Sequence, residues 1–258
     1  MLVCQYANNG NLYQYLEKHF DILTWGDKKS IILEIAYGIK AIHDEDLIHS
    51  NLHPGNILRH VNRKTGDQHT YISDLGICNP VDERHTSKVY GVLPFVAPEV
   101  LQGSKCTKSS DIYSLAMLMW TIITGRKLYS DRPHDVYLIL EICSELRPEI
   151  PRSTPHTLVD LIMKCWDSDP TKRPGIREVI FMLNWIPFSE GGPIELSTDP
   201  FPQHQNAIYA SHLLYSHDTE ERLRKLKEEG SRKLKEEIRK EDLEGFVEII
   251  NDLDVFVE

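Results

Sequence analysis

Two polar side chains in loops of this chain, Asn56 and Asp74, carry oxygen atoms of the kind that hold a divalent cation. Asn51 and Asn56 share a polar run that ends in a short apolar segment, and Asp74 follows a second short segment of this type. Carboxylate and amide oxygens are hard ligands suited to Mg²⁺. In an arbitrary loop, however, Asn and Asp more often cap a turn. These residues alone leave both interpretations open.

The motifs around these residues follow a fixed order. They are His49-Ser50-Asn51-Leu52 with Asn56, then Asp74-Leu75-Gly76, Ala97-Pro98-Glu99, Asp111, Cys165-Trp166 and Arg173-Pro174. In order and spacing the set resembles the C-terminal lobe of a eukaryotic protein kinase, whose pattern is H-R-D-L-x-x-x-N, D-F-G and A-P-E. The resemblance covers roughly residues 1–186, and two of its runs look most like the tyrosine-kinase-like branch. Any one tripeptide would be a weak signal, but the ordered set is specific.

The resemblance implies a site for ATP and Mg²⁺. Asn56 and Asp74 match the two residues that ligate Mg²⁺ in this family. Residues 1–7 look like the last strand of the N-terminal lobe and the hinge beside the adenine, and Leu58 would pack beneath that ring. The expected nucleotide-binding residues are Cys4, Gln5, Tyr6, Leu58 and Ser73.

Other matches are expected to be structural. From a buried helix, Asp111 should hold the backbone of the catalytic loop, which begins at His49. Glu99 and Arg173 should form the internal ion pair that fixes the end of the activation segment, residues 74–99. Trp166 is expected to be a core aromatic residue.

The catalytic loop also departs from the family pattern. Asn51 stands where the family has the catalytic Asp, and an amide can orient a hydroxyl group but cannot take its proton. A positioned general base contributes ~10²- to 10⁴-fold to the rate. Ser50 replaces the Arg that pairs with a phosphorylated activation loop. Phosphorylation at Thr86, Ser87 or Tyr90 should therefore not switch this molecule by that route. His53 replaces the Lys of Ser/Thr kinases, which leaves the acceptor residue open.

The sequence contains neither the Gly-rich loop G-x-G-x-x-G-x-V nor the V-A-I-K lysine of the family. We therefore expect a C-terminal lobe without the N-terminal lobe. A half-open site of this kind positions ATP poorly, and positioning supplies most of the catalysis of phosphoryl transfer.

These features predict a catalytically impaired protein kinase relative, a pseudokinase or signalling scaffold that works by binding ATP and a protein partner or substrate. The alternative is an active kinase, seen as a fragment, that transfers the γ-phosphate of ATP to protein hydroxyl groups. A truncated product without a function of its own is a third possibility.

The overall composition excludes several other classes. The formal net charge of −10 gives no electrostatic footprint for nucleic acid or for an anionic membrane surface. No apolar run approaches the ~18 to 20 residues that span a bilayer, and the first residues do not resemble a secretory signal. The five cysteines are scattered, which favours reduced thiols and a cytoplasmic location.

The expected fold class is α+β, a protein-kinase-like fold with a mostly helical C-terminal lobe. A capping box at Thr24 predicts a long helix to about Asp44 with an apolar stripe that includes Ile42. Further helices are expected at 11–19, 110–124, 135–146, 157–167 and 176–185, and short strands at 47–49, 56–58 and 70–72. A turn at 62–68 and a long loop at 74–99 complete the lobe.

The composition changes after residue 186. Residues 187–206 are rich in Pro and Gly and predict a linker. Residues 207–258 predict a charged helical tail that begins with an apolar island at 208–215. A solvated helix is the default for the charged repeat at 224–237, and a partner-binding helix is the alternative.

Overall fold

The structure is a computed structural model of the chain and describes residues 6–62, 64–75, 79–80, 89–187 and 203–215. The chain divides into two compact units, residues 1–215 and 216–258. All described residues belong to the first unit. Residues 188–202 of the predicted linker at 187–206 and residues 216–258 of the predicted tail at 207–258 lie outside the described residues, as do Cys4, Gln5, Thr86 and Ser87.

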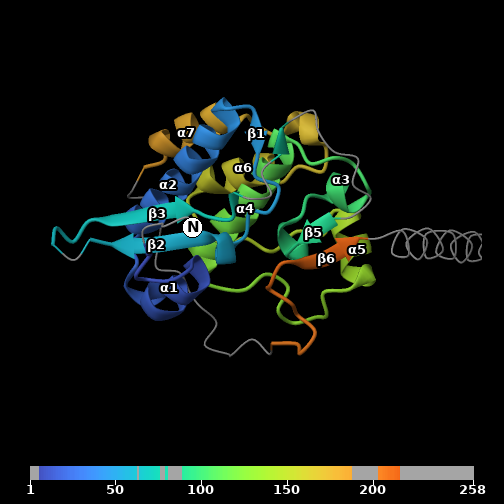
Figure 1. Cartoon of the computed structure of the whole chain (residues 1–258), viewed down its shortest axis with the longest axis horizontal. Coiled ribbons are helices and arrows are strands. Elements are labelled where there is room, and N and C mark those ends of the chain that lie inside the picture. Colours follow the sequence, from blue (N-terminus) through green and yellow to red (C-terminus); the bar gives the residue numbers. More distant parts are fainter. Residues whose placement is uncertain (1–5, 63, 76–78, 81–88, 188–202, 216–258) are drawn as a thin grey trace, which may run out of the picture. The chain divides into compact units, whose positions relative to one another are not determined.

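Helices form most of the regular structure that is described (Figure 1). In chain order the elements are α1 Leu12–His19, η1 Phe20–Ile22, α2 Trp25–Asp44, β1 Leu47–Ile48, η2 Pro54–Asn56, β2 Ile57–Val61, β3 Gln68–Ile72, β4 Asn79–Pro80, β5 Val89–Gly91, η4 Leu93–Phe95, α3 Pro98–Leu101, α4 Lys108–Thr124, α5 Val136–Cys143, α6 His156–Cys165, η5 Pro170–Lys172, α7 Ile176–Trp185 and β6 His212–Tyr215.

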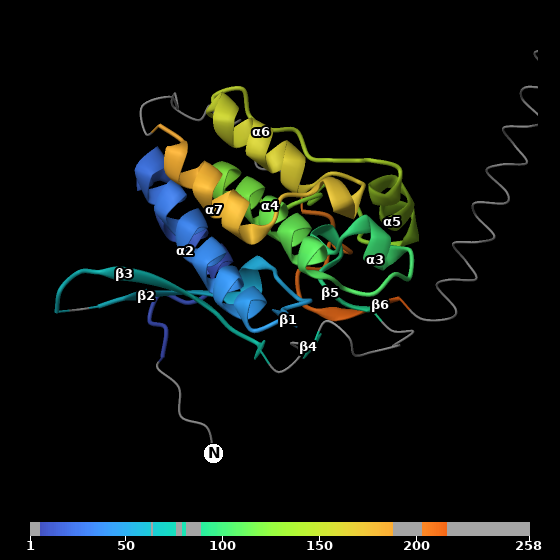
Figure 2. The same cartoon turned by 90° about the horizontal axis from the view of Figure 1, so that it is seen from above.

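Helix α4 is the centre of the core. Every residue from Ser110 to Thr124 is buried, which is the pattern of a helix that is covered on all sides. Helices α2 and α6 pack against α4, and α7 packs against α2 and α6. Figure 2 shows these four helices side by side. The packing of α4 therefore fixes the position of the residues at its N-terminal end.

The predicted helices are confirmed, several with the predicted ends. Helix α2 begins after the Thr24 capping box, in which the Thr24 hydroxyl group accepts from the amide of Asp27. Helix α4 ends at Gly125, whose φ of 67° is the left-handed conformation that glycine permits. One detail of the α2 stripe is wrong, because Ile42 is partly exposed and the neighbouring His43 is buried.

The described strands form three antiparallel pairs, β1–β4, β2–β3 and β5–β6. Strands β2 and β3 are paired from Ile57↔Ile72 to Val61↔Gln68. The turn between them contains Gly66 at φ 77°, as the sequence predicted. This hairpin lies along α2 (Figure 1), and the end of β3 leads directly to Asp74.

Two predictions about irregular regions are corrected. The expected loop at 74–99 contains the short strands β4 and β5 and the 3-10 turn η4, and α3 begins at its end. Residues 212–215, which were assigned to a helical tail, form strand β6 and pair with β5. The apolar island at 208–215 is too short for a stable helix of its own, whereas the free edge of β5 offers it backbone hydrogen bonds.

Within the described ranges, no helix combines the length and apolar character needed to cross a membrane.

Candidate functional site

Asp111, at the N-terminal end of α4, holds the loop that starts at His49. One carboxylate oxygen of Asp111 accepts from the amide of Ser50 at 2.9 Å, and the other accepts from the amide of His49 at 2.9 Å. The ring of His43 contacts the second oxygen at 2.9 Å. Asp111 is 1% exposed. This buried carboxylate is therefore fully hydrogen-bonded, and the backbone contact expected for Asp111 is confirmed.

The Asp111 contacts stabilise a strained backbone. Ser50 has φ 67° and Asp74 has φ 66°, a conformation that costs residues with a side chain about 1–3 kcal/mol. Such a conformation persists only where its surroundings enforce it. At Ser50 the hydrogen bond from its amide to Asp111 supplies that constraint.

His49 connects the loop to the end of β3. Its Nε2 donates to the carbonyl of Ser73 at 3.0 Å, and its Nδ1 lies 3.3 Å from the amide nitrogen of Asn51, from which it accepts. This pattern needs the neutral ring with its proton on Nε2. The ring is fully buried. His49 thus fixes the position of Asn51 relative to the segment that carries Asp74.

Asn51, Asn56 and Asp74 converge in the structure. The Nδ2 atoms of Asn51 and Asn56 lie 3.3 Å and 3.4 Å from the same carboxylate oxygen of Asp74. The Nδ2 of Asn56 also donates to the carbonyl of Asn51 at 2.9 Å. Asp74 is exposed and Asn51 is 5% exposed. One carboxylate and two amides therefore face a common, solvent-accessible point.

This donor set fits Mg²⁺ bound together with phosphate. Mg²⁺ is commonly held by one or two carboxylates plus phosphate oxygens, and Asp74 and the amide oxygen of Asn56 are ligands of that kind. Among the described residues no group of three or more His, Cys, Asp or Glu side chains could hold a metal. The residue types of Asn56 and Asp74 thus suit a cation shared with a phosphate ligand, whereas the Asn56 amide presents its Nδ2, not its oxygen, to Asp74 in this structure.

Of the other predicted nucleotide-binding residues that are described, Leu58 and Ser73 lie close to Asn56 and Tyr6 does not. Leu58 is half-buried in β2 and forms a β-bridge with Asn11, so the segment after the predicted hinge runs beside it. The hydroxyl group of Ser73 donates to the carbonyl of Asn56 at 3.0 Å. Tyr6 is 82% exposed. No contact of Tyr6 brings it to this site.

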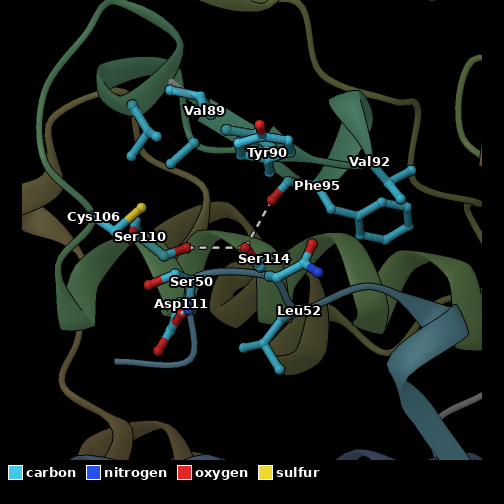
Figure 3. Close-up of a pocket in the computed structure, with 14 residues that line it drawn as sticks. Ser50, Leu52, Val89, Tyr90, Val92, Phe95, Cys106, Ser110, Asp111 and Ser114 are labelled. Carbon is cyan, nitrogen blue, oxygen red and sulfur yellow. Dashed lines mark hydrogen bonds between the residues drawn. The ribbon is translucent and has the colours of Figure 1, made fainter. Parts of the chain in front are cut away.

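Ser50 faces a narrow pocket between the catalytic loop and the region of β5 (Figure 3). Cys106, Ser110 and the aromatic ring of Phe95 line it, together with Asp111. Burial raises the pKa of the Cys106 thiol. Among the described residues that line this pocket there is no cationic side chain.

His53 is buried, and its Nδ1 accepts from the amide of Gly55 at 3.2 Å. Burial, together with a smaller contribution from His49, lowers the pKa of His53 to about 4, and Asp74 opposes this shift. His53 is thus neutral at pH 7. It therefore cannot supply the positive charge of a Lys at this position.

The end of the 74–99 segment is fixed by an ion pair. Both terminal nitrogens of Arg173 lie 2.7 Å from the two carboxylate oxygens of Glu99. Arg173 also donates to the carbonyls of Ser109 and Asp167, and its side chain is completely buried. The predicted Glu99–Arg173 pair is confirmed, and the core position of Trp166, 7% exposed, is confirmed as well.

Two residues at this site were not identified from the sequence. His43 contacts Asp111, and only its position one residue after the apolar stripe of α2 could have signalled its burial. Ser211, from the segment before β6, places its hydroxyl oxygen 3.5 Å from Oδ1 of Asn51. No sequence pattern links Ser211 to Asn51, because the two residues are 160 positions apart.

Most of the described chain is similar in sequence to known proteins. Residues 1–183 match the family model described as protein tyrosine and serine/threonine kinase. Similar proteins include serine/threonine-protein kinase STY17 of Arabidopsis thaliana, 28% identical over 72% of this chain and 32% of the relative. A probable serine/threonine-protein kinase of Dictyostelium discoideum is 32% identical over 70% of this chain and 13% of its own length. Probable serine/threonine-protein kinase drkC of the same organism is 31% identical over 71% and 25%. The chain thus spans about a third or less of these relatives.

Proposed function

Because this chain belongs to the protein tyrosine and serine/threonine kinase family, we propose that it is a catalytically impaired kinase domain that acts in signalling by binding. We assign residues 1–186 to the C-terminal lobe of that fold and to the tyrosine-kinase-like branch. The observation that carries this proposal is Asn51, which stands at the family's catalytic base and directs its amide nitrogen toward Asp74.

The chemistry of Asn51 explains the proposed impairment. Phosphoryl transfer to a protein hydroxyl group needs the nucleotide and its metal ions held in place, the acceptor oxygen aligned, and a group that takes its proton. The Oδ1 of Asn51 can accept a hydrogen bond from an acceptor hydroxyl group and so align it. An amide does not take up the proton at physiological pH, so transfer should be slower by ~10²- to 10⁴-fold.

ATP with Mg²⁺ is the nucleotide that this family uses, and the convergence of Asn56 and Asp74 supports its binding here. Mg²⁺ would neutralise phosphate charge when bound. Asp74 would ligate it through its carboxylate and Asn56 through its amide oxygen, which turns the Asn56 side chain away from its present contacts. Leu58 would form the apolar floor under the base. The nucleotide would then act as a ligand that orders the site.

Ser50 supports regulation without the usual phosphate switch. The family's Arg at this position binds a phosphorylated activation loop through charge-assisted hydrogen bonds. Here the short hydroxyl side chain faces the Cys106 pocket, and no cationic residue is among the described residues that line it. A phosphate on Tyr90, whose side chain is 51% exposed, would find no cationic partner among these residues.

The test compares the chain with its Asn51→Asp variant, each joined behind an intact kinase N-terminal lobe that supplies the Gly-rich loop and lysine. We expect slow residual phosphoryl transfer from labelled ATP by the Asn51 form, and a gain of ~10²- to 10⁴-fold in the variant. Adding Asp74→Asn to that variant should abolish the gain. Transfer by the Asn51 form at the variant's rate would overturn the proposed impairment. Silence of both forms would point to further defects and favour a purely binding role.

A further inference from the structure

The segment that ends in β6 is anchored beside the Asn51 site by several backbone contacts. The amide of His204 donates to the carbonyl of Ser130 at 2.7 Å, and the amide of His134 donates to the carbonyl of Asn206 at 3.0 Å. The Nδ1 of His134 lies 2.9 Å from the carbonyl of Ile208, to which it donates. Residues 204–208 are thus held by the region between α4 and α5.

Tyr209 is the side-chain anchor of this segment. Its hydroxyl group donates to the carbonyl of Leu128 at 2.8 Å. Its ring makes edge contacts with the rings of Tyr13 and His134, at centroid distances of 5.8 Å and 4.9 Å. The ammonium of Lys127 lies 5.2 Å from the same ring. An aromatic residue with a satisfied hydroxyl group is a common anchor of a bound peptide.

Beyond Tyr209 the segment becomes a strand. Tyr90 is paired with Leu213 and Gly91 with His212, in antiparallel register, with an irregularity next to Val89. Figures 1 and 2 both show β6 alongside β5. Backbone pairing at a sheet edge is a general mode of peptide binding, in which alternate side chains provide the specificity.

The two leucines of β6 illustrate that alternation. Leu214 is 9% exposed, whereas Leu213 is 41% exposed. A methyl group placed on Gly91 would lie 3.8 Å from Cδ1 of Leu214 and 3.6 Å from Oδ1 of Asn51. Gly91 is therefore a neighbour of both the buried leucine and the Asn51 amide. Leu214 is the apolar residue that this site accepts.

Ser211 completes the arrangement. Its exposed hydroxyl group lies between the Tyr209 anchor and the Leu214 contact, at 3.5 Å from Oδ1 of Asn51. This distance is long for a hydrogen bond between a hydroxyl group and an amide oxygen. It is nevertheless the position from which a hydroxyl group would donate to Asn51.

We propose that residues 204–215 are a built-in occupant of the acceptor side of the Asn51 site, with Ser211 standing where the hydroxyl group of a partner protein would stand. This inference rests on the proposed function, because it assigns the acceptor side to Asn51. The site takes an extended polypeptide of the pattern Tyr-x-Ser-x-x-Leu. Such a partner binds only when β6 is released from β5.

Competition between the built-in strand and an external one sets the size of the effect. A segment tethered in the same chain reaches an effective concentration in the millimolar range. An external peptide at micromolar concentration is therefore excluded while β6 is docked. Release of β6 should strengthen the binding of that peptide by at least about tenfold.

The experiment uses a fluorescein-labelled peptide with the sequence of residues 206–215 and measures its affinity for the 258-residue chain by anisotropy, without nucleotide or Mg²⁺. The Leu214→Asp variant places a carboxylate in the buried contact and should bind the peptide at least about tenfold more tightly than the wild type. The matched control is Leu213→Asp, because Leu213 is adjacent and exposed; this variant should bind like the wild type. A peptide that itself carries Leu214→Asp should not bind.

Equal peptide affinity in all three proteins, or tight binding of the altered peptide, would overturn the inference. Should Leu214→Asp fail to fold, which its melting curve would show, Tyr209→Ala removes the anchor and leaves the Leu214 contact in place. Amide hydrogen exchange then gives a second measurement, because the backbone of β6 should be protected in the wild type and exchange faster in Tyr209→Ala. Since no nucleotide is present, failure here is distinguishable from failure of the proposed nucleotide chemistry.

Discussion

The two sides of the catalytic loop differ in how completely they keep the pattern of their family. On the side that faces α4, Asp111 accepts from His49, Ser50 and His43, and the Glu99–Arg173 pair is bidentate and buried. On the side that carries the exposed Asp74, Asn51 stands where we propose that the catalytic base is replaced. The contacts that support the loop do not involve Asn51, so under the proposed function the loop would keep its shape for binding without that base.

On the supporting side of the loop, the side that faces α4, Arg173→Met should have the largest effect on stability. The substitution keeps most of the side-chain volume but leaves the Glu99 carboxylate, 15% exposed, without its partner. Removing one partner of a buried ion pair costs about 3–5 kcal/mol. We expect the free energy of unfolding, measured by urea titration, to fall by that amount.

The matched control for this prediction is Arg177→Ala. Arg177 also pairs with a carboxylate, that of Asp44, but its side chain is 76% exposed. Exposed pairs contribute little, so the urea midpoint should stay unchanged. A similar loss in both variants would show that the Glu99–Arg173 pair has no special role.

The protonation of His53 should make the stability of the folded protein depend on pH. Its pKa of about 4 in the folded protein lies below the ordinary value of 6.5, so the unfolded chain takes up a proton first as the pH falls. The stability contributed by neutral His53 is complete above about pH 6.5 and is lost as the pH falls toward about 4. This shift corresponds to about 3 kcal/mol.

The measurement compares urea unfolding of the wild type and His53→Asn between pH 8 and pH 4. Asn can still accept from the amide of Gly55 but does not titrate. The variant should lose less stability over this range, and the difference should develop between about pH 6.5 and 4. Parallel curves would show that His53 is not buried in its neutral form.

Asp111→Asn keeps the shape of the side chain and tests its hydrogen bonds to the loop that starts at His49. The amide group of Asn must direct its NH₂ toward a backbone amide that needs an acceptor. One donor is then left unsatisfied, at a cost of about 2 kcal/mol in the free energy of unfolding. Asp46→Asn is the control, because Asp46 is 88% exposed and pairs only with Lys108 among its described contacts. That control should not alter stability, and a comparable loss in both variants would contradict the role of Asp111.

The sequence predicted the helices and contacts on the side of the loop that faces α4 better than the contacts on the side that faces solvent. Helices such as α2 and α7 could be predicted because their apolar periodicity and the Thr24 cap are local signals. The Asp111 and Glu99–Arg173 contacts followed from the resemblance to kinases. His43 was missed because Ile42 already completed the apolar stripe of α2. A buried His has no period of its own.

The pairing of β6 with β5 could not be predicted for a different reason. Strand β6 has only four residues, and its partner lies in a segment that showed no periodicity. Backbone pairing between short strands carries no residue code, so nothing in either segment identifies the other. The contact between Ser211 and Asn51 depends on this pairing. It therefore became visible only in the structure.

The smallest expected change in stability, and the sharpest test of the solvent side, comes from Asp74→Asn. Asp74 is exposed, and its hydrogen bonds with other described residues are long, at 3.3 Å and 3.4 Å to the amides of Asn51 and Asn56. Its loss should shift the melting temperature of the free chain by less than about 1 °C. Any rise in melting temperature produced by ATP with Mg²⁺ should disappear, because the carboxylate that would bridge metal and phosphate is gone. Glu45→Gln, an exposed carboxylate at the end of α2, is the control and should keep that rise. A nucleotide-induced rise in melting temperature that survives Asp74→Asn would mean that the nucleotide binds without a metal contact to Asp74. The proposed role of Asp74 as a Mg²⁺ ligand would then be wrong.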